Sequence, residues 1–222
     1  MSQKENKSLK ILKIIIKHTG LGITDALLNG AASKAYDAYK DIRDYSKKCN
    51  EALYAKQLET FLTSLDVTQQ EFEDFFRTNP DNLRLGLETI KILEQTILEK
   101  QAEMLARAFL LYIKTPTPEN KSLFHKNEHI IKKVDYFLIE EIEKLTDYPV
   151  DPPEPQFEYT EQGLLMNFDP YVMNPHKDLI NFGFLIPPKM EMNILAASDI
   201  FEVTPFFDFF YQNIFKDPKK DN

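Results

Sequence analysis

The segment at residues 81–114 reads DNLRLGLETIKILEQTILEKQAEMLARAFLLYIK, and it decides the fold class. It is the longest segment of the chain in which apolar residues recur at helical spacing. These residues form one broad stripe: Leu83, Leu87, Ile90, Leu93, Ile97, Met104, Leu105, Ala108, Phe109 and Tyr112. Because so wide a stripe must be buried, we expect a central helix over 81–114, capped by Asp81, with other helices packed around it.

Helical periodicity continues on both sides of this segment. Residues 33–64 predict one long helix or two short ones. Thr68 and Glu71 have capping-box spacing, which predicts the start of a short helix. That helix would turn three aromatic side chains inward: Phe72, Phe75 and Phe76. Residues 123–145 show a further amphipathic pattern, so we expect another helix that ends near Asp147.

A proline-rich stretch follows this last helix. Residues 148–156 read YPVDPPEPQ, with four prolines among nine residues, and this density argues against regular structure. We therefore expect a helical domain over 1–147, a linker over 148–157 and a C-terminal module over 158–222.

Within the C-terminal module the spacing of apolar residues changes. Short helical patterns lie at 159–166 and 175–182, and a glycine-led apolar run follows at 183–186. A strand is expected at 194–203. Thr204 would then cap a final helix that contains the sequence FFDFFYQNIF.

The net charge of −8 is unevenly distributed. Residues 1–50 hold ten Lys and Arg against five acidic residues, which leaves 17 basic against 30 acidic residues in the rest. An acidic body argues against general nucleic-acid binding and is compatible with a basic protein partner. The same acidity would also serve solubility without any partner.

Cysteine content and hydropathy bear on the compartment. A single cysteine, Cys49, excludes an internal disulfide and fits a reducing environment. The apolar run at 9–16 is interrupted by Lys10 and Lys13 and precedes no cleavage site, so we expect no secretory signal. No run approaches the roughly 18 uninterrupted apolar residues of a membrane span. The expected location is the cytoplasm.

Residues 9–17, LKILKIIIK, place three lysines along one edge of a helix: Lys10, Lys13 and Lys17. The pattern fits a basic amphipathic helix at a membrane surface, and equally a short core helix whose lysines face water. Gly20, Gly22 and Gly30 follow, and small residues permit close approach of a backbone to another helix or to lipid. Both interpretations of residues 9–30 stay open at this point.

Few residues form patterns with chemical meaning. His125, Glu128 and His129 match the H-x-x-E-H spacing of inverted zinc-protease motifs. A third ligand is needed, and Glu202 is the only acidic residue at a roughly suitable separation. The motif lies at a helix start beside several lysines, so two surface histidines are the simpler interpretation. Cys49 follows two lysines but has no histidine near it in sequence. We expect no enzymatic activity, no bound metal and no cofactor.

The C-terminal sequence carries the most recognisable pattern. LINFGFLI at 179–186 is followed, after a spacer, by FEVTPFF at 201–207, and EKQAEMLARAFLLYIK precedes both at 99–114. This layout resembles the abortive-infection alpha-like family of bacterial proteins, often found in prophages and defence islands. The resemblance covers roughly residues 55–215. The glycine that usually follows the Thr-Pro-aromatic unit is missing, since Phe207 and Asp208 stand there.

The resemblance implies a mainly α fold, in which a helical bundle is followed by a small winged-helix-like α+β module. It also implies a role in phage exclusion or a related conflict, with no catalytic residues to carry over. A winged helix suggests DNA, but residues 149–215 hold only Lys177 and Lys189 as basic side chains besides His176, against ten acidic residues. Because DNA affinity depends on Lys and Arg at phosphates, we expect no nucleic-acid partner.

The sequence therefore predicts a non-enzymatic bacterial protein that binds another protein, and a basic partner is compatible with its charge. Two groups of side chains are the expected contacts: Lys10, Lys13 and Lys17 near the N-terminus, and Phe206, Phe209 and Phe210 in the final helix. Two alternatives stay open. One is a membrane-active effector that uses residues 9–30 at the periphery of the inner membrane, and the other is an immunity-type protein that neutralises a basic toxin.

Overall fold

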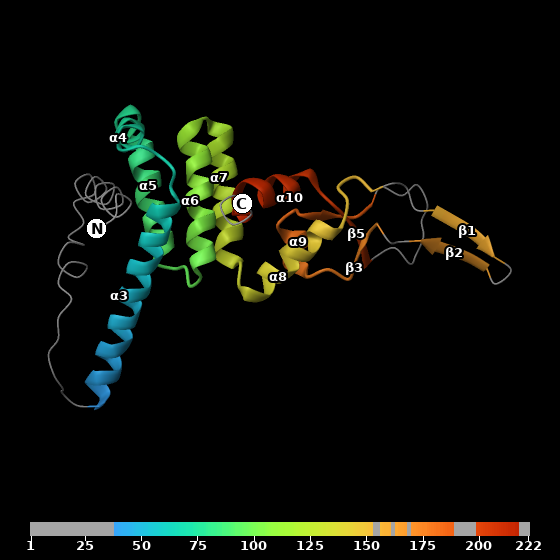
Figure 1. Ribbon diagram of the computed structural model, residues 1–222, viewed down its shortest axis with the longest axis horizontal. Coiled ribbons are helices and arrows are strands. Elements are labelled where there is room, and N and C mark those ends of the chain that lie inside the picture. The colour runs from blue at the N-terminus through green and yellow to red at the C-terminus, as the bar shows by residue number, and fades with distance from the viewer. Residues whose placement is uncertain (1–37, 153–155, 161–162, 168–169, 189–198, 218–222) are drawn as a thin grey trace. The chain divides into compact units, whose positions relative to one another are not determined.

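The computed structural model describes residues 38–152, 156–160, 163–167, 170–188 and 199–217. The described part is mainly helical, with a small antiparallel sheet toward the C-terminus (Figure 1). The chain divides into two compact units, Met1–Lys133 (unit 1) and Val134–Asn222 (unit 2). The expected boundary lay later, at residue 147, because the helical pattern at 123–145 looked continuous.

Unit 1 consists of helices in its described part. They are α3 (Ala38–Ser64), α4 (Gln69–Thr78), α5 (Pro80–Leu93), α6 (Glu99–Lys114) and α7 (Pro118–Lys133) (Figure 1). Of the two alternatives for residues 33–64, the described residues from 38 onward form one long helix.

The ring of Phe109 on α6 is the centre of the core of unit 1. It contacts Phe61 on α3, Phe75 on α4 and Phe124 on α7, with ring centroids 6.1, 5.7 and 5.8 Å apart. All four side chains are at most 5% exposed. Because offset and edge-on aromatic pairs contribute beyond the area they bury, one residue of α6 joins three other helices.

The expected single helix over 81–114 is wrong, because α5 ends at Leu93 and α6 begins at Glu99. Side chains stabilise the break. Thr96 Oγ1 donates a hydrogen bond to the Leu93 carbonyl (2.9 Å), and Gln101 Oε1 accepts from the amides of Ile97 and Leu98 (2.9 and 3.0 Å). Ile97, expected in the buried stripe, is 72% exposed.

Caps elsewhere in unit 1 follow the local sequence. The capping box of Thr68 and Glu71 is confirmed, since each side chain accepts the other's backbone amide hydrogen. The inward direction of the α4 phenylalanines is confirmed as well. Asp81 is not the cap of α5, because Asn79 Oδ1 accepts from the Asp81 amide and Pro80 occupies the first helical position.

Helices α4 and α5 make an unusually close approach at Gly86. A Cβ atom built at Gly86 would lie 2.6 Å from Cε1 and 2.8 Å from Cζ of Phe76. Real Cβ atoms essentially never come that near another heavy atom. The absence of a side chain at Gly86 is therefore what lets the Phe76 ring lie against α5.

Unit 2 mixes short helices and strands. Its order is α8 (Tyr136–Lys144), the 3-10 turn η1 (Leu145–Asp147), β1 (Gln156–Thr160), β2 (Gly163–Asn167), β3 (Val172–Met173), α9 (Lys177–Asn181), β4 (Leu185–Ile186), β5 (Ile200–Val203), α10 (Pro205–Phe210) and the π-helical turn η3 (Tyr211–Phe215). Strands β1 and β2 pair as an antiparallel hairpin, and β3-β5-β4 form an antiparallel three-stranded sheet.

Two expectations for this part of the chain are wrong. Residues 123–145 form two helices instead of one, because Asp135 caps a new helix after Lys133. The helical pattern at 159–166 belongs instead to the β1–β2 hairpin, in which aromatic and polar residues alternate at 157–160. The proline-rich stretch is tied to the sheet, since Val150 forms a parallel bridge with Val203.

Thr204 links the sheet of unit 2 to its last helix. Its hydroxyl donates to the Gly183 carbonyl (2.8 Å) and accepts from the Phe207 amide (3.2 Å), which confirms the expected cap. Gly183 has a φ of 77°, a conformation that favours glycine. The ring of Phe184 next to it is fully buried and contacts Phe210, with centroids 4.9 Å apart.

Candidate functional site: an exposed aromatic surface on unit 2

Two aromatic side chains at the start of α8 face away from the core. Tyr136 is 75% exposed and Phe137 is 53% exposed. Their direction follows from the cap, because Asp135 Oδ1 accepts from the Leu138 amide (2.8 Å) and sets where the helix begins. Leu138 and Ile142, one helical turn apart, then occupy the buried side of α8.

His176 lies against this pair. Its ring centroid is 5.4 Å from that of Phe137 in an edge-on arrangement. His176 caps α9, since its Nδ1 accepts from the Asp178 amide at 3.3 Å. We call Tyr136, Phe137 and His176 the α8 aromatic surface.

Carboxylates flank the α8 aromatic surface on both sides. Asp135 precedes Tyr136 and is exposed, and Asp178 Oδ2 lies 3.9 Å from His176 Nδ1. Lys177 is the basic neighbour. Unit 2 as a whole holds 17 acidic residues against six basic ones. Aromatic faces beside carboxylates attract cations both by the ring quadrupole and by charge, so this arrangement suits Arg and Lys side chains.

The expected contacts in the final helix have different surroundings. Phe210 is 0% exposed and packs on Phe184, so it is part of the core and is not available to a partner. Phe206 and Phe209 are half-buried and stack on each other with centroids 6.5 Å apart. The other expected contacts, Lys10, Lys13 and Lys17, lie outside the described residues.

Two residues of the zinc-protease spacing, His125 and Glu128, lie in contact on α7. Glu128 Oε2 lies 3.2 Å from His125 Nδ1, and Glu128 Oε1 accepts from Lys132 Nζ at 3.0 Å. His129 is exposed. Glu202, the expected third ligand, belongs to β5 in unit 2. Within the described ranges, no three His, Cys, Asp or Glu side chains gather as a metal would require. Cys49 is a free, exposed thiol on α3.

Sequence reasoning missed the α8 aromatic surface. Phe137 fitted the amphipathic pattern of 123–145 and was expected inside. The pattern failed at this residue because the chain leaves the helix at Val134 and Asp135, and Phe137 lies in the first turn of a new helix. Asp135 itself was the available signal, since an aspartate before an apolar run is a helix-start residue.

Comparison with known proteins adds no relative. No family model, no curated protein and no solved structure matches the chain. Among the described helices, none combines the length and apolar content that crossing a bilayer requires.

Proposed function

We propose that this protein acts by binding a basic protein partner through the α8 aromatic surface. The observation that carries the proposal is the exposure of Tyr136 and Phe137 side by side at a capped helix start. An aromatic side chain can bury about 150–250 Å² of surface. While it faces solvent, the free energy that this burial would contribute is not realised. Adjacent exposed aromatic residues in a polar rim are typical of the anchor residues of protein interfaces.

The charge of unit 2 favours a basic partner. Seventeen acidic against six basic residues produce a negative field that attracts a partner rich in Lys and Arg. The same field opposes nucleic acid, whose phosphates need basic side chains. Helix α9 has only five residues, which is short for reading a DNA groove.

The biological setting we propose is phage defence. The support is the resemblance of residues 179–186 and 201–207 to the abortive-infection alpha-like pattern. The order β3, α9, β4, β5 and the antiparallel pairing of β4 with β5 are compatible with the winged-helix-like module which that resemblance implies. In this setting the small module of β3, α9, β4 and β5 would bind a protein and not DNA.

The same charge favours one second candidate, an immunity-type protein that neutralises a basic toxin. The two candidates use one surface and differ in the partner. A captured phage or host protein would support the defence role, whereas a captured toxin would support the immunity role.

The test is capture by the tagged full-length chain from infected and uninfected bacterial cells. We expect a basic protein that is retained at low salt and released at high salt. The double variant Tyr136→Ser/Phe137→Ser should lose it. Ile97→Ser is the matched control, because Ile97 is an equally exposed apolar residue in unit 1, at 72%. Equal capture by the double variant and the wild type would show that the partner does not bind at the α8 aromatic surface.

A further inference from the structure

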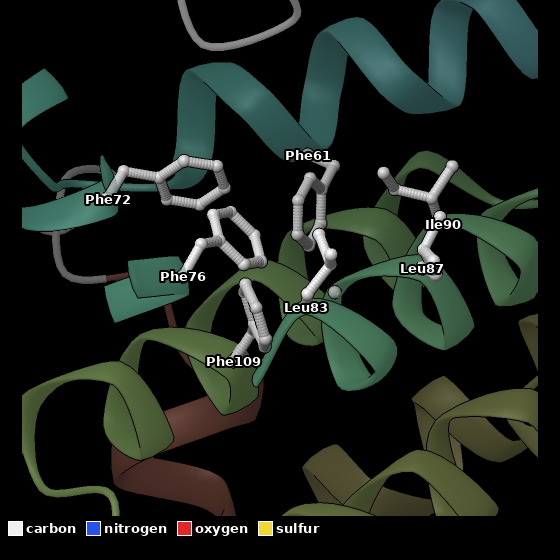
Figure 2. Close-up of a pocket in the computed structure, with 8 residues that line it drawn as sticks. Phe61, Phe72, Phe76, Leu83, Leu87, Ile90 and Phe109 are labelled. Atoms are coloured by element: carbon white, nitrogen blue, oxygen red, sulfur yellow. The ribbon is translucent and has the colours of Figure 1, made fainter. Parts of the chain in front are cut away.

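The small hollow on α5 is a packing space and no binding site (Figure 2). Its accessible volume is about 10 Å³, roughly the room that one water molecule takes. Its lining is apolar and comes from α3, α4, α5 and α6. A binding surface on unit 1 therefore has to be formed by exposed side chains, and the exposed side of α7 forms one.

The exposed side of α7 is basic. Lys126, His129 and Lys133 are exposed and stand at i, i+3 and i+7, which places them on one side of the helix. Glu128, in the middle of the helix, is already paired, since its Oε1 accepts from Lys132 Nζ at 3.0 Å. We call Lys126, His129 and Lys133 the α7 basic face.

The exposed side of α8 is acidic. Helix α8 continues directly into η1, so the exposed residues Glu140, Glu143 and Asp147 stand at the same i, i+3 and i+7 spacing. The lysine of this helix is paired within it, because Lys144 Nζ donates to Glu141 Oε1 at 2.8 Å. We call Glu140, Glu143 and Asp147 the α8 acidic face.

We infer that the α7 basic face binds the α8 acidic face of a second copy of this chain. The two faces are opposite in charge and equal in spacing, and each extends over about 10 Å of helix at 1.5 Å per residue. Opposite charges at such positions on facing helices form interhelical ion pairs. Because each exposed ion pair contributes little and is screened by salt, the association should be weak and salt-sensitive.

The charges favour a second copy over nucleic acid or an anionic membrane. Two lysines and one histidine hold a phosphate polymer only weakly at physiological salt, and the net charge of −8 repels it. An acidic helix with the matching spacing, by contrast, is present in every copy of the chain. The inference uses neither Tyr136 nor Phe137, so it stands independently of the proposed function.

Sedimentation velocity of the full-length protein tests the inference by charge reversal. The wild type should sediment faster than a monomer at low salt and as a monomer at high salt. Lys126→Glu/Lys133→Glu reverses the α7 basic face and should be monomeric at low salt. Glu140→Lys/Glu143→Lys reverses the α8 acidic face and should be monomeric as well. An equimolar mixture of the two variants should associate again, because each reversed face then meets a complementary one.

Lys91→Glu/Lys114→Glu is the matched control, because it changes the net charge equally at exposed lysines of α5 and α6. It should associate like the wild type, and circular dichroism checks that every variant keeps its helices. A monomeric wild type at low salt would overturn the inference. So would association that either single-face variant retains or that the mixture does not restore. Loss of association in the control would overturn it too, since net charge alone would then be the cause.

Discussion

At the scale of single residues, Gly86 is the position where the fold leaves no room for a change. We expect Gly86→Ala to lower the free energy of unfolding by about 1–3 kcal/mol, because the new methyl group overlaps the Phe76 ring. Urea denaturation measures the loss. The double variant Gly86→Ala/Phe76→Leu removes the overlapping ring atoms, and should cost less than the two single changes added together. Additive losses would show that the contact is not the cause.

Tyr54 on α3 makes stability depend on alkaline pH. Burial, with a smaller contribution from the charge of Glu94, raises the pKa of Tyr54 to about 12. The folded state therefore keeps this proton above pH 10 while the unfolded state releases it. The contribution to stability is present below the unfolded pKa and is lost as pH rises through the folded one.

We expect the unfolding free energy of the wild type to fall more steeply between pH 10 and about pH 12 than that of Tyr54→Phe. Lysines titrate in both proteins and cancel in the comparison. Tyr112, whose pKa is raised by burial and by Asp81, contributes in the same direction, so Tyr54→Phe/Tyr112→Phe should be flatter still. Parallel curves for wild type and both variants would contradict this assignment.

At the scale of elements, Gln101 decides that residues 81–114 form two helices. Its Oε1 accepts two amides at the break, and its Nε2 donates to the Ile131 carbonyl of α7 (3.0 Å). Gln101→Leu would leave the buried Leu98 amide, the part-buried Ile97 amide and the Ile131 carbonyl without these partners. We expect a loss of about 2–3 kcal/mol in urea denaturation. Gln95→Leu makes the same change at an exposed position of the same break and should be nearly neutral. A similar loss in both variants would show that the hydrogen bonds of Gln101 are not the cause of the lost stability.

Much of the helical architecture could be predicted from periodicity. The two helices that were wrongly predicted as continuous share one cause. The patterns at 81–114 and 123–145 stay in phase across a break, so apolar spacing alone does not reveal it. Side-chain caps make the breaks, by Gln101 in one case and Asp135 in the other. Of the caps that the sequence names, Thr68 and Thr204 are correct, whereas Asp81 is not, because Asn79 caps α5.

The candidate site could not be predicted in the same way. Phe137 has the residue type of a core position but lies exposed in the first turn of α8, whereas Phe124 lies within α7 and is buried. Phe210 shows the reverse error. The run of phenylalanines at 206–210 looks like a surface patch, but in α10 three of them contact Phe184: Phe206, Phe207 and Phe210. Exposure of aromatic residues depends on tertiary packing, which hydropathy does not contain.

At the scale of the whole molecule, charge is divided unequally between the two units. Unit 1 holds 21 basic and 18 acidic residues, and unit 2 holds six basic and 17 acidic ones. Self-repulsion therefore destabilises unit 2 more than unit 1. The screening length falls from about 10 Å at 0.1 M salt to about 3 Å at 1 M.

We expect added potassium chloride to slow amide hydrogen exchange in unit 2 more than in unit 1. Hydrogen-exchange mass spectrometry resolves the two, with peptides from α10 and β5 compared with peptides from α6 and α7. The reference is the same protein at 0.1 M salt. An equal change in both units would mean that salt acts generally on hydrophobic burial and that charge segregation has no measurable cost.

The cap at Asp135 has a consequence for how fast the proposed partner would bind. It fixes the start of α8 before any partner arrives, and Tyr136 and Phe137 have only two side-chain torsions each to settle. Association of the proposed partner at this surface would then need no folding step and would be limited by diffusional encounter. Added salt should slow association with a basic partner and leave dissociation nearly unchanged, whereas truncating Phe137 should act on dissociation.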